Sequence, residues 1–478
     1  HSYVRYMLGA TLDIFNYAEI LDFDPNDIFS EDYMNTLEGY LTFLANLSTS
    51  DGQSFRQGDD SGDGNVLKTY RSIIDALGND NLLWTYSGKK EGTAPDFLGY
   101  AYDIGQKAVM RTGFDDKDMS IYINADGSVG SHSHNDDLAL NLYAYGKMLL
   151  SDRRQQNYNY NSNNGALFYS TRGHNTIEIN STSMIGKSAT SDKVIKDPDG
   201  NEITIYYAGT GKYKSGTLHP ENREFNSLYH FIQAETLGYT GVPVFDENFK
   251  AVREVLMVAP SYVIVTDIIT PDGSDDDADE NTYAQYWHMI PNANVTIDEV
   301  NSLVKTNFAS GANLTIAPVI GELPIIASKH TAWYNSGSIV SDYVRLEKKT
   351  DATAVYNTVL YPTPGGKDVE IETSSILLEG MSESDASAFS FEAMEDGTDI
   401  KTKVWYYNLE DLNKKRNVIF GDYQTDGEVA LVEVTSHMAQ DRTSLLRSLY
   451  WLKLQVGPTA SRPGPMLLKQ AIISLIWE

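Results

Sequence analysis

The chain has 478 residues, enough for two or three domains, and it has the composition of a globular protein, with 41% hydrophobic and 22% charged residues. A formal net charge of −29 argues against a general binder of nucleic acid or of anionic membranes, although a local basic cleft could still accept an anionic substrate. The absence of cysteine excludes disulfides, thiolate zinc sites and cysteine nucleophiles, and no apolar run is long enough to predict a membrane span.

The N-terminal part of the chain has the hydrophobic spacing of helices. Apolar residues recur at helical intervals over 3–21 and about 31–47, and further helices are predicted at about 66–78 and near 94–106. Antiparallel helix pairs of this kind predict that residues 1–106 form part of a helical (α/α) toroid. Because the chain begins without Met or a signal peptide, we expect a processed product that is truncated at its N-terminus.

From about residue 107 the hydrophobic period changes to two. Short alternating segments such as HNTIEIN, EITIYYAG and SYVIVTDIIT are separated by Gly, Pro and Asp turns, which predicts a large antiparallel β-sandwich over 107–330. Residues 331–478 contain further strands, which either complete the sandwich or form a smaller C-terminal β domain, and end in an apolar, basic tail. The expected fold class is α+β multidomain, a partial α/α toroid of helical hairpins followed by a large antiparallel β-sandwich.

One strand connection is unusually acidic. The run PDGSDDDADEN occupies residues 271–281 between two predicted strands. A solvated loop is the simpler interpretation of such a charge run, and a Ca²⁺-binding loop is the alternative.

The segment SVGSHSHND contains two of the nine histidines of the chain, His132 and His134. In an extended segment, residues i and i+2 point to the same face, so both imidazoles would lie together and would need either neutral tautomers or a shared cation. Zn²⁺ is suited to neutral imidazole and carboxylate, and Asp152 and His174 follow on neighbouring segments. The alternative is that His134 and His174 are polar residues whose hydrogen bonds are satisfied by the backbone.

The same region resembles a known family. SHSHNDDLALNLYAYGKMLLSD, followed by STRGHNTIEIN, is similar to the central signature of the heparinase II/III-like polysaccharide lyases. That signature has a Gly-His-x-His-x-Asp-type segment, an apolar strand with Tyr-Gly and a closing Asp, and then Ser-Arg-x-His-Asn-Thr. The match covers residues 128–180, and the family's fold is a helical toroid followed by an antiparallel β-sandwich.

Carried over by position, the resemblance implies roles for individual residues. It assigns Zn²⁺ to His134, Asp152 and His174, and it places His132 in the substrate cleft as a catalytic residue. The zinc would be structural and would hold the segment that presents His132. Neighbouring groups such as Asp136 could orient the metal ligands.

The first residues of the chain resemble the alginate-lyase branch of this superfamily. The family's Tyr-x-Arg-Tyr segment matches Tyr3-Val4-Arg5-Tyr6, which makes Tyr3 the catalytic tyrosine and assigns Arg5 and Tyr6 to substrate binding. The family also uses a histidine on a helix upstream of this tyrosine, and His1 lies too close to Tyr3 to match that spacing. The alternative for Tyr3 and Tyr6 is packing on a helix face.

The resemblance implies a lyase that cleaves a uronate-containing polysaccharide by β-elimination and leaves unsaturated uronate ends. Alginate is the first substrate expected and a heparan-type glycosaminoglycan the second; the partner is thus an anionic polysaccharide or oligosaccharide, with no nucleic acid and no membrane span. A bacterial secreted or periplasmic location follows from the same resemblance. The alternatives are a non-catalytic carbohydrate-binding β-sandwich with a structural zinc, a glycoside hydrolase with paired carboxylates, and a Ca²⁺-dependent adhesion protein.

Overall fold

The computed structural model describes residues 2–58, 70–125, 134–153, 162–185, 192–207, 216–242, 245, 247–272, 280–334, 339–382, 385–396, 400–409, 418–425, 427–439 and 442–452. Most of the acidic run at 271–281 lies outside these residues, and so does the tail after residue 452. Among the described residues, no helix is long and apolar enough to cross a membrane.

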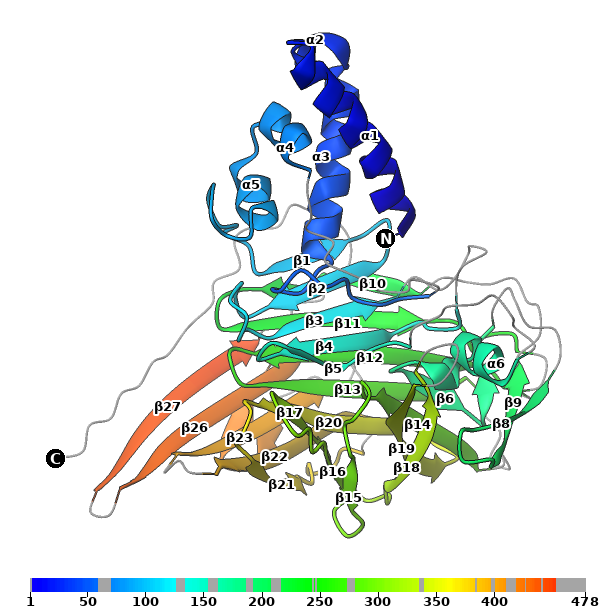
Figure 1. The fold of residues 1–478 in the computed structure, drawn as a ribbon. Helices are drawn as coiled ribbons and strands as arrows, with labels where there is room; N and C mark the ends of the chain where they lie inside the picture. Colours follow the sequence, from blue (N-terminus) through cyan, green and yellow to red (C-terminus); the bar gives the residue numbers. More distant parts are fainter. Residues whose placement is uncertain are drawn as a thin grey trace.

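The N-terminal helices lie together on one side of the β structure, drawn in blue in Figure 1. They are α1 (Ser2–Ile20), α2 (Pro25–Ile28), α3 (Glu31–Asn46), α4 (Arg71–Leu77) and α5 (Asp80–Tyr86). Ser30 begins α3 by accepting a hydrogen bond from the Tyr33 amide at 3.3 Å. Leu37, Leu41 and Leu44 recur at helical spacing on α3 and are buried in the core that the helices share.

This small helical cluster does not amount to an α/α toroid within the part of the chain that the structure describes. The helix predicted near 94–106 is wrong, because that segment contains β1 (Gly99–Tyr102), whereas the short helix α5 was missed. Pairing of β1 with β2 (Lys107–Arg111), in the register Gly99↔Met110, stabilises the extended form. The spacing of apolar residues along one segment does not show whether that segment will form hydrogen bonds with a neighbouring strand, so the strand was not predicted.

The first sheet carries the helices. Its order is β1-β2-β3-β4-β5, with β3 at Ser120–Asn124, β4 at Ala139–Ala144 and β5 at Lys147–Leu150. The segment LYAYGKMLLSD, which matches the single apolar strand of the family signature, is a hairpin here, since Tyr145 and Gly146 both have positive φ, 51° and 79°, and reverse the chain. Phe55, in the loop after α3, stacks on Tyr122 with ring centroids 5.6 Å apart and joins the helices to this sheet.

An eight-stranded antiparallel sheet forms the middle layer of the described structure. Its order is β10 (Thr217–Phe225), β11 (Tyr229–Thr236), β12 (Phe249–Val258), β13 (Tyr262–Pro271), β20 (Ala354–Thr363), β17 (Asn313–Pro318), β16 (Leu303–Lys305) and β15 (Thr296–Asp298). Val263 and Val265 pack toward the first sheet, whereas Tyr262 and Ile264 pack toward a C-terminal sheet. Because both faces of β13 are covered, its sequence is an almost continuous apolar run.

A seven-stranded sheet lies beside the first sheet and helps to carry the candidate site. Its order is β18 (Ile326–Trp333), β19 (Val340–Thr350), β14 (Asn281–His288), β6 (Ile177–Ile179), β7 (Thr182–Ser183), β9 (Glu202–Tyr207) and β8 (Lys193–Lys196). The short helix α6 (Asn163–Tyr169) and the 3₁₀ turn η1 (Thr171–Gly173) lead into β6.

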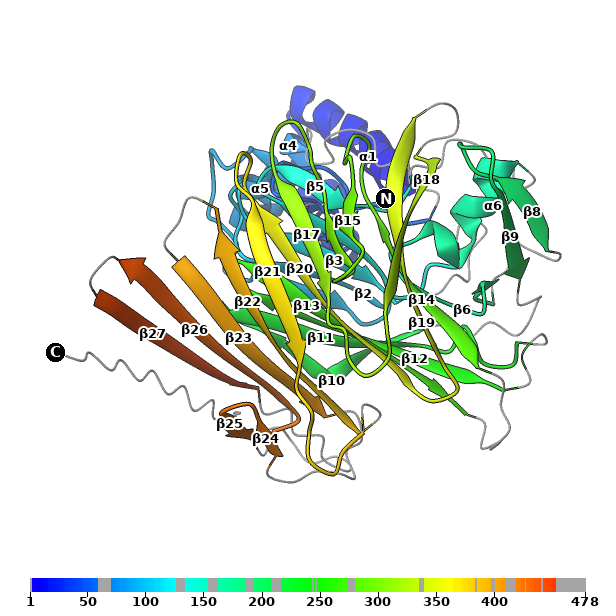
Figure 2. The same cartoon turned by 90° about the horizontal axis from the view of Figure 1, so that it is seen from below.

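The third layer is a C-terminal sheet, drawn in yellow to red in Figure 2. It contains β21 (Val369–Ser375), β22 (Ala386–Glu395), β23 (Ile400–Leu409), β26 (Val429–Ala439) and β27 (Arg442–Leu452), next to the pair β24 (Val418–Phe420) and β25 (Tyr423–Thr425). Strands after residue 331 therefore occur in three places. β19 lies in the seven-stranded sheet, β20 lies in the eight-stranded sheet, and the remaining strands form the separate C-terminal layer.

Candidate functional site

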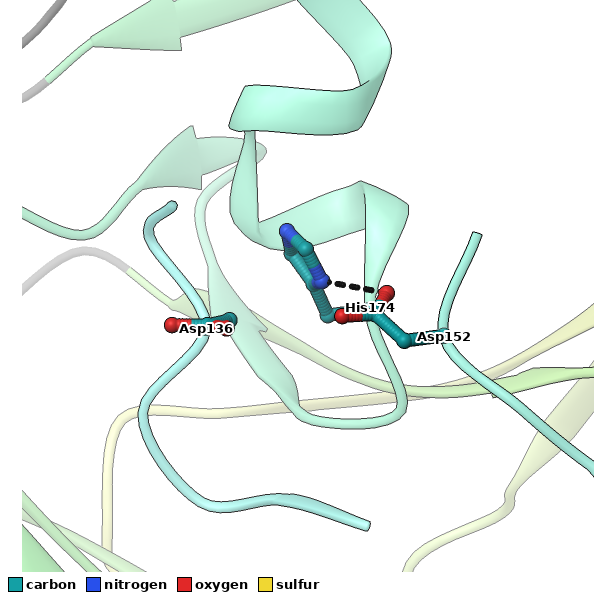
Figure 3. A group of neighbouring side chains, drawn as sticks. All are labelled: Asp136, Asp152 and His174. Carbon is teal, nitrogen blue, oxygen red and sulfur yellow. Dashed lines mark hydrogen bonds and ion pairs between the residues drawn. The ribbon is translucent and has the colours of Figure 1, made fainter. Parts of the chain in front are cut away.

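Three side chains that could hold a metal ion meet where the first sheet faces β6. Asp136 precedes β4, Asp152 follows β5, and His174 follows η1. One ligand atom of each lies within 4.8 Å of the others, and all three residues are buried. Figure 3 shows the His174 ring beside Asp152, with Nδ1 2.7 Å from Oδ1, and Asp136 on a neighbouring segment.

Short hydrogen bonds fix the backbone that presents these groups. The 3₁₀ turn closes with the His174 amide donating to the Thr171 carbonyl at 3.1 Å. The next residue, Asn175, donates to the Leu140 carbonyl at 2.7 Å and accepts from the His288 amide at 2.5 Å. Strand β4, the segment after η1 and the end of β14 are thereby held in one arrangement.

The electrostatics of the cluster favour a bound cation or an added proton. Burial raises the pKa of the Asp136 carboxyl above its ordinary value. Burial by itself lowers the pKa of His174, but Asp152 and, more weakly, Asp136 outweigh this, so the pKa of the imidazole is raised. Two buried carboxylates beside one imidazole are stable only with a proton or a metal cation among them.

The donor set fits Zn²⁺. Imidazole nitrogen and carboxylate oxygen are ligands that Zn²⁺ prefers in sites without cysteine. His174 Nε2 is buried and has no hydrogen-bond partner among the described residues, while Nδ1 faces Asp152. A carboxylate on one ring nitrogen, with the other nitrogen left for a metal, is the arrangement usual for metal-binding histidines.

His134 lies beside this cluster. Its ring centroid is 5.3 Å from that of His174 and 4.3 Å from that of Tyr169, against which it packs edge to face. The Asn135 amide donates to the Tyr169 carbonyl at 3.1 Å, which fixes this segment to the end of α6. The structure thus brings Asp152 and His174 together, and places the His134 ring next to His174 but outside the group whose ligand atoms lie within 4.8 Å of one another.

Asp136 is the member that sequence reasoning undervalued, because it was given only an orienting role. Its spacing from His134 is i, i+2, the same spacing that singled out His132 and His134. That pattern could have nominated Asp136 as a ligand. What the spacing could not show is its distance from Asp152 and His174, which depends on how β4, β5 and β6 pack.

Only some of the residues predicted to act in catalysis and substrate binding have described side chains. His132 lies outside the described residues, and so does the side chain of Tyr3, whose backbone is in the first turn of α1. Arg5 is half-buried near Tyr70 and contributes to the electrostatic environment of its hydroxyl. Tyr6 is 82% exposed, so its ring does not pack in the helical core.

A chain of buried polar groups supports the site from the seven-stranded sheet. Arg153, next to Asp152, places Nη2 2.6 Å from His288 Nδ1, and His288 Nε2 donates to the Arg172 carbonyl at 2.9 Å. Burial and the nearby Arg153 charge lower the pKa of His288 well below its ordinary value, so this imidazole is neutral. Arg172 in turn pairs with the fully buried Glu178 at 2.8 Å.

Comparison with known proteins supports a shared fold. Residues 122–444 match the family described as heparinase II/III-like, C-terminal. No curated protein matches the chain.

Among solved structures, the chain is similar to heparan sulfate lyase HepC from Pedobacter heparinus, with 16% identity and a TM-score of 0.61, over 88% of this chain and 58% of that chain. It is also similar to a heparinase III, with 16% identity and a TM-score of 0.61, over 84% of this chain and 59% of that chain. The chain thus spans less than two thirds of the length of these relatives.

At such identity the solved structures establish the fold alone, whereas the family match covers more than half of the chain. Most of the β strands and the whole metal-ligand cluster lie within the matched residues. The chain therefore belongs to the heparinase II/III-like family, of which it contains the C-terminal β domain.

Proposed function

We propose that this chain is the part of a polysaccharide lyase that carries its β domain, and that the enzyme cleaves a uronate-containing polymer. The observation that carries the proposal is the buried cluster of Asp136, Asp152 and His174 beside His134, inside the region that matches the lyase family. His134, beside this cluster, follows His132 by two residues in the chain, so a metal bound here would hold the segment that carries His132.

The reaction would be a β-elimination. The C5–H bond of the uronate breaks next to its carboxyl group, the C4–O4 bond breaks, and a C4–C5 double bond forms without consumption of water. One group takes the C5 proton and another delivers a proton to the leaving O4. Tyr3 is proposed for the proton transfers and His132 for neutralising the carboxylate or acting as the opposite base. Donors placed around the developing charge are commonly worth about 3–4 kcal/mol each.

The proposed metal is Zn²⁺, held by His134, Asp152 and His174 with Asp136 as a further donor. Bound there, it would supply a positive charge that neutralises the buried carboxylates and links three segments of chain. Its role is structural, because the cluster is buried. A Ca²⁺ site in the acidic run at 271–281 stays an alternative prediction.

Two substrates are candidates. Alginate is favoured by the Tyr3-Val4-Arg5-Tyr6 segment, with Arg5 and Tyr6 in substrate binding. A glycosaminoglycan is favoured by the printed names of the structural relatives, which are a heparan sulfate lyase and a heparinase III. Either substrate agrees with the proposed secreted or periplasmic location.

The decisive experiment incubates the protein with alginate and with heparan sulfate and follows the ultraviolet absorbance of unsaturated uronate ends. We expect absorbance to rise with one polymer, and the variants His132→Gln and Tyr3→Phe to lose about a hundredfold or more in kcat. New reducing ends without absorbance would indicate a hydrolase. Binding without either product would indicate a carbohydrate-binding module.

A further inference from the structure

A polar cavity lies beside the metal-ligand cluster. It has a volume of about 230 Å³ and lies between the loop after α3, the β4–β5 hairpin and the segments that follow β14 and β18. Its lining includes Gln53, Arg56, Lys147, Ser151 and Tyr334. Four separate parts of the chain therefore build it, which makes it a feature of the tertiary fold.

The charge of the cavity is opposite to that of the protein. Its lining residues include the cations Arg56 and Lys147 and, within the described part of the chain, no carboxylate. The chain as a whole has a formal charge of −29. The described lining of this concave surface thus has two cations and no acid, although the protein as a whole is acidic. Such a surface favours an anionic ligand, since low-dielectric walls focus the local field.

Arg56 is held in a defined orientation by an uncharged partner. Its guanidinium donates a hydrogen bond to the Tyr334 hydroxyl and lies over the same ring, with Cζ 4.9 Å from the centroid. No carboxylate among the described residues forms an ion pair with Arg56. A planar guanidinium fixed on an aromatic ring keeps further N–H groups for a carboxylate or sulfate.

Lys147 is also positioned by uncharged groups. Its ammonium donates to the Ser310 carbonyl and lies 3.9 Å from the centroid of the Phe308 ring. Gly311 packs against this side chain: a Cβ there would lie 2.9 Å from Lys147 Cε, so a larger residue would displace the end of the lysine. Burial lowers the pKa of Lys147, which an anionic ligand would offset.

The cavity is connected to the metal-ligand cluster through one asparagine. Asn141 donates to the Arg56 carbonyl at 3.1 Å and accepts from the Asp152 amide at 3.1 Å. Ser151, which lines the cavity, directly precedes Asp152. A ligand in the cavity would therefore lie next to the segment that we propose to be fixed by the metal.

We propose that this cavity is a subsite for the anionic group of an acidic sugar, with Arg56 as its principal partner and Lys147 as the second cation. The inference rests on the proposed function, because it treats the chain as a protein that acts on an anionic polysaccharide. The anionic group is a carboxylate or a sulfate, which share the charge and the acceptor oxygens that a guanidinium recognises.

The test is equilibrium binding, measured by calorimetry in a His132→Gln background so that the probe is not cleaved. The probes are a mannuronate tetrasaccharide, its carboxyl-reduced form, a heparan sulfate tetrasaccharide and its desulfated form. We expect Arg56→Gln to weaken binding of an acidic probe by about tenfold to a hundredfold and to leave the carboxyl-reduced probe unaffected. A loss that disappears on desulfation would identify sulfate as the bound group.

Two further variants keep the test independent of folding defects. Lys147→Met removes the charge but keeps the aliphatic stem, and we expect a several-fold loss for acidic probes alone. Lys401→Met is the matched control, because Lys401 pairs with Glu392 on the C-terminal sheet, and its variant should bind all probes normally.

The proposal is overturned if Arg56→Gln and Lys147→Met bind acidic and neutral probes in the same ratio as the control, or if no acidic probe binds. Failure of the proposed function gives a different result. In that case the two variants would still lose binding, but the protein with His132 restored would make no unsaturated product from either polymer.

Discussion

Arg253 and Asp267 form an ion pair that has no exposed surface, with Nε and Oδ1 2.7 Å apart on the neighbouring strands β12 and β13. The same guanidinium donates to the carbonyls of Leu138 at 2.7 Å and Asn175 at 2.6 Å. It therefore ties the segment after Asp136 and the segment after His174 to the middle sheet. The relative position of Asp136 and His174 therefore depends on a charge pair that is far from both of them in the sequence.

Asp267→Asn should strongly destabilise the protein. The substitution leaves the Arg253 charge buried without its carboxylate, which costs about 3–5 kcal/mol of unfolding free energy. Urea denaturation followed by tryptophan fluorescence measures this loss. The matched control is Asp75→Asn, which breaks the exposed pair with Arg71 on α4 and should leave the urea midpoint nearly unchanged. Equal losses in the two variants would show that the buried pair has no special role.

Metal removal should lower thermal stability, and the loss should depend on the candidate ligands. We expect EDTA to lower the Tm of the wild type and added Zn²⁺ to restore it, because a ligand that binds only the folded state stabilises that state. Asp152→Asn and His174→Gln should contain less than one equivalent of zinc by mass spectrometry and should no longer respond to EDTA.

Asp136→Asn distinguishes a ligand from a neighbour. If Asp136 binds the metal, the variant should lose about tenfold or more in zinc affinity. A residue that only orients a metal ligand gives a similar loss only when it is hydrogen-bonded to that ligand. Full zinc content with an unchanged Tm in all three variants would contradict the metal site.

His230 should make the protein sensitive to acid. It is fully buried, its Nε2 donates to the Arg111 carbonyl at 2.7 Å, and burial lowers its pKa to about 4. Because the folded-state pKa is below the unfolded value of about 6.5, the unfolded state binds more protons between these values, and stability falls as pH decreases through that window. His230→Gln should flatten this dependence by up to about 3 kcal/mol.

His219 is the control for this pH experiment because its shift has the opposite sign. Its hydrogen bond to Glu235 raises the pKa of the imidazole, so its contribution is present below the unfolded pKa and is lost as pH rises through the folded value. His219→Gln should therefore lose stability mainly in acid. Urea midpoints from pH 4 to pH 8 distinguish the two variants, and parallel curves would refute the assignment for His230.

Asn141 should couple the cavity to the metal-ligand cluster, so Asn141→Ala should disturb both. Removal of this buried amide leaves the Arg56 carbonyl and the Asp152 amide without the partner that joins them, which costs about 1–3 kcal/mol. We expect reduced zinc affinity as well, because the Asp152 backbone is no longer fixed. Asn26→Ala on the exposed α2 is the control and should change neither property. A stable Asn141→Ala variant with normal zinc affinity would show that Asn141 does not couple the cavity to the metal-ligand cluster.

Local patterns predicted the elements whose hydrogen bonds are local. The helices expected over 3–21 and about 31–47 are confirmed as α1 and α3, because apolar residues at helical spacing need only one buried face. The helix expected near 94–106 is a strand, since its stability comes from pairing with β2. The switch to alternating strands near residue 107 is also confirmed, but spacing could not assign the strands to three layers.

The sequence by itself determined the family, the β-rich class of the C-terminal part, and the nomination of His134, Asp152 and His174, because these depend on residue types at fixed intervals along the chain. Only the tertiary structure decided that Asp136 joins these residues and that Arg253 and Asp267 hold their segments. The same is true of the basic cavity around Arg56. Each of these features joins residues far apart in the sequence, and their distances are set by the packing of sheets, which no local pattern encodes.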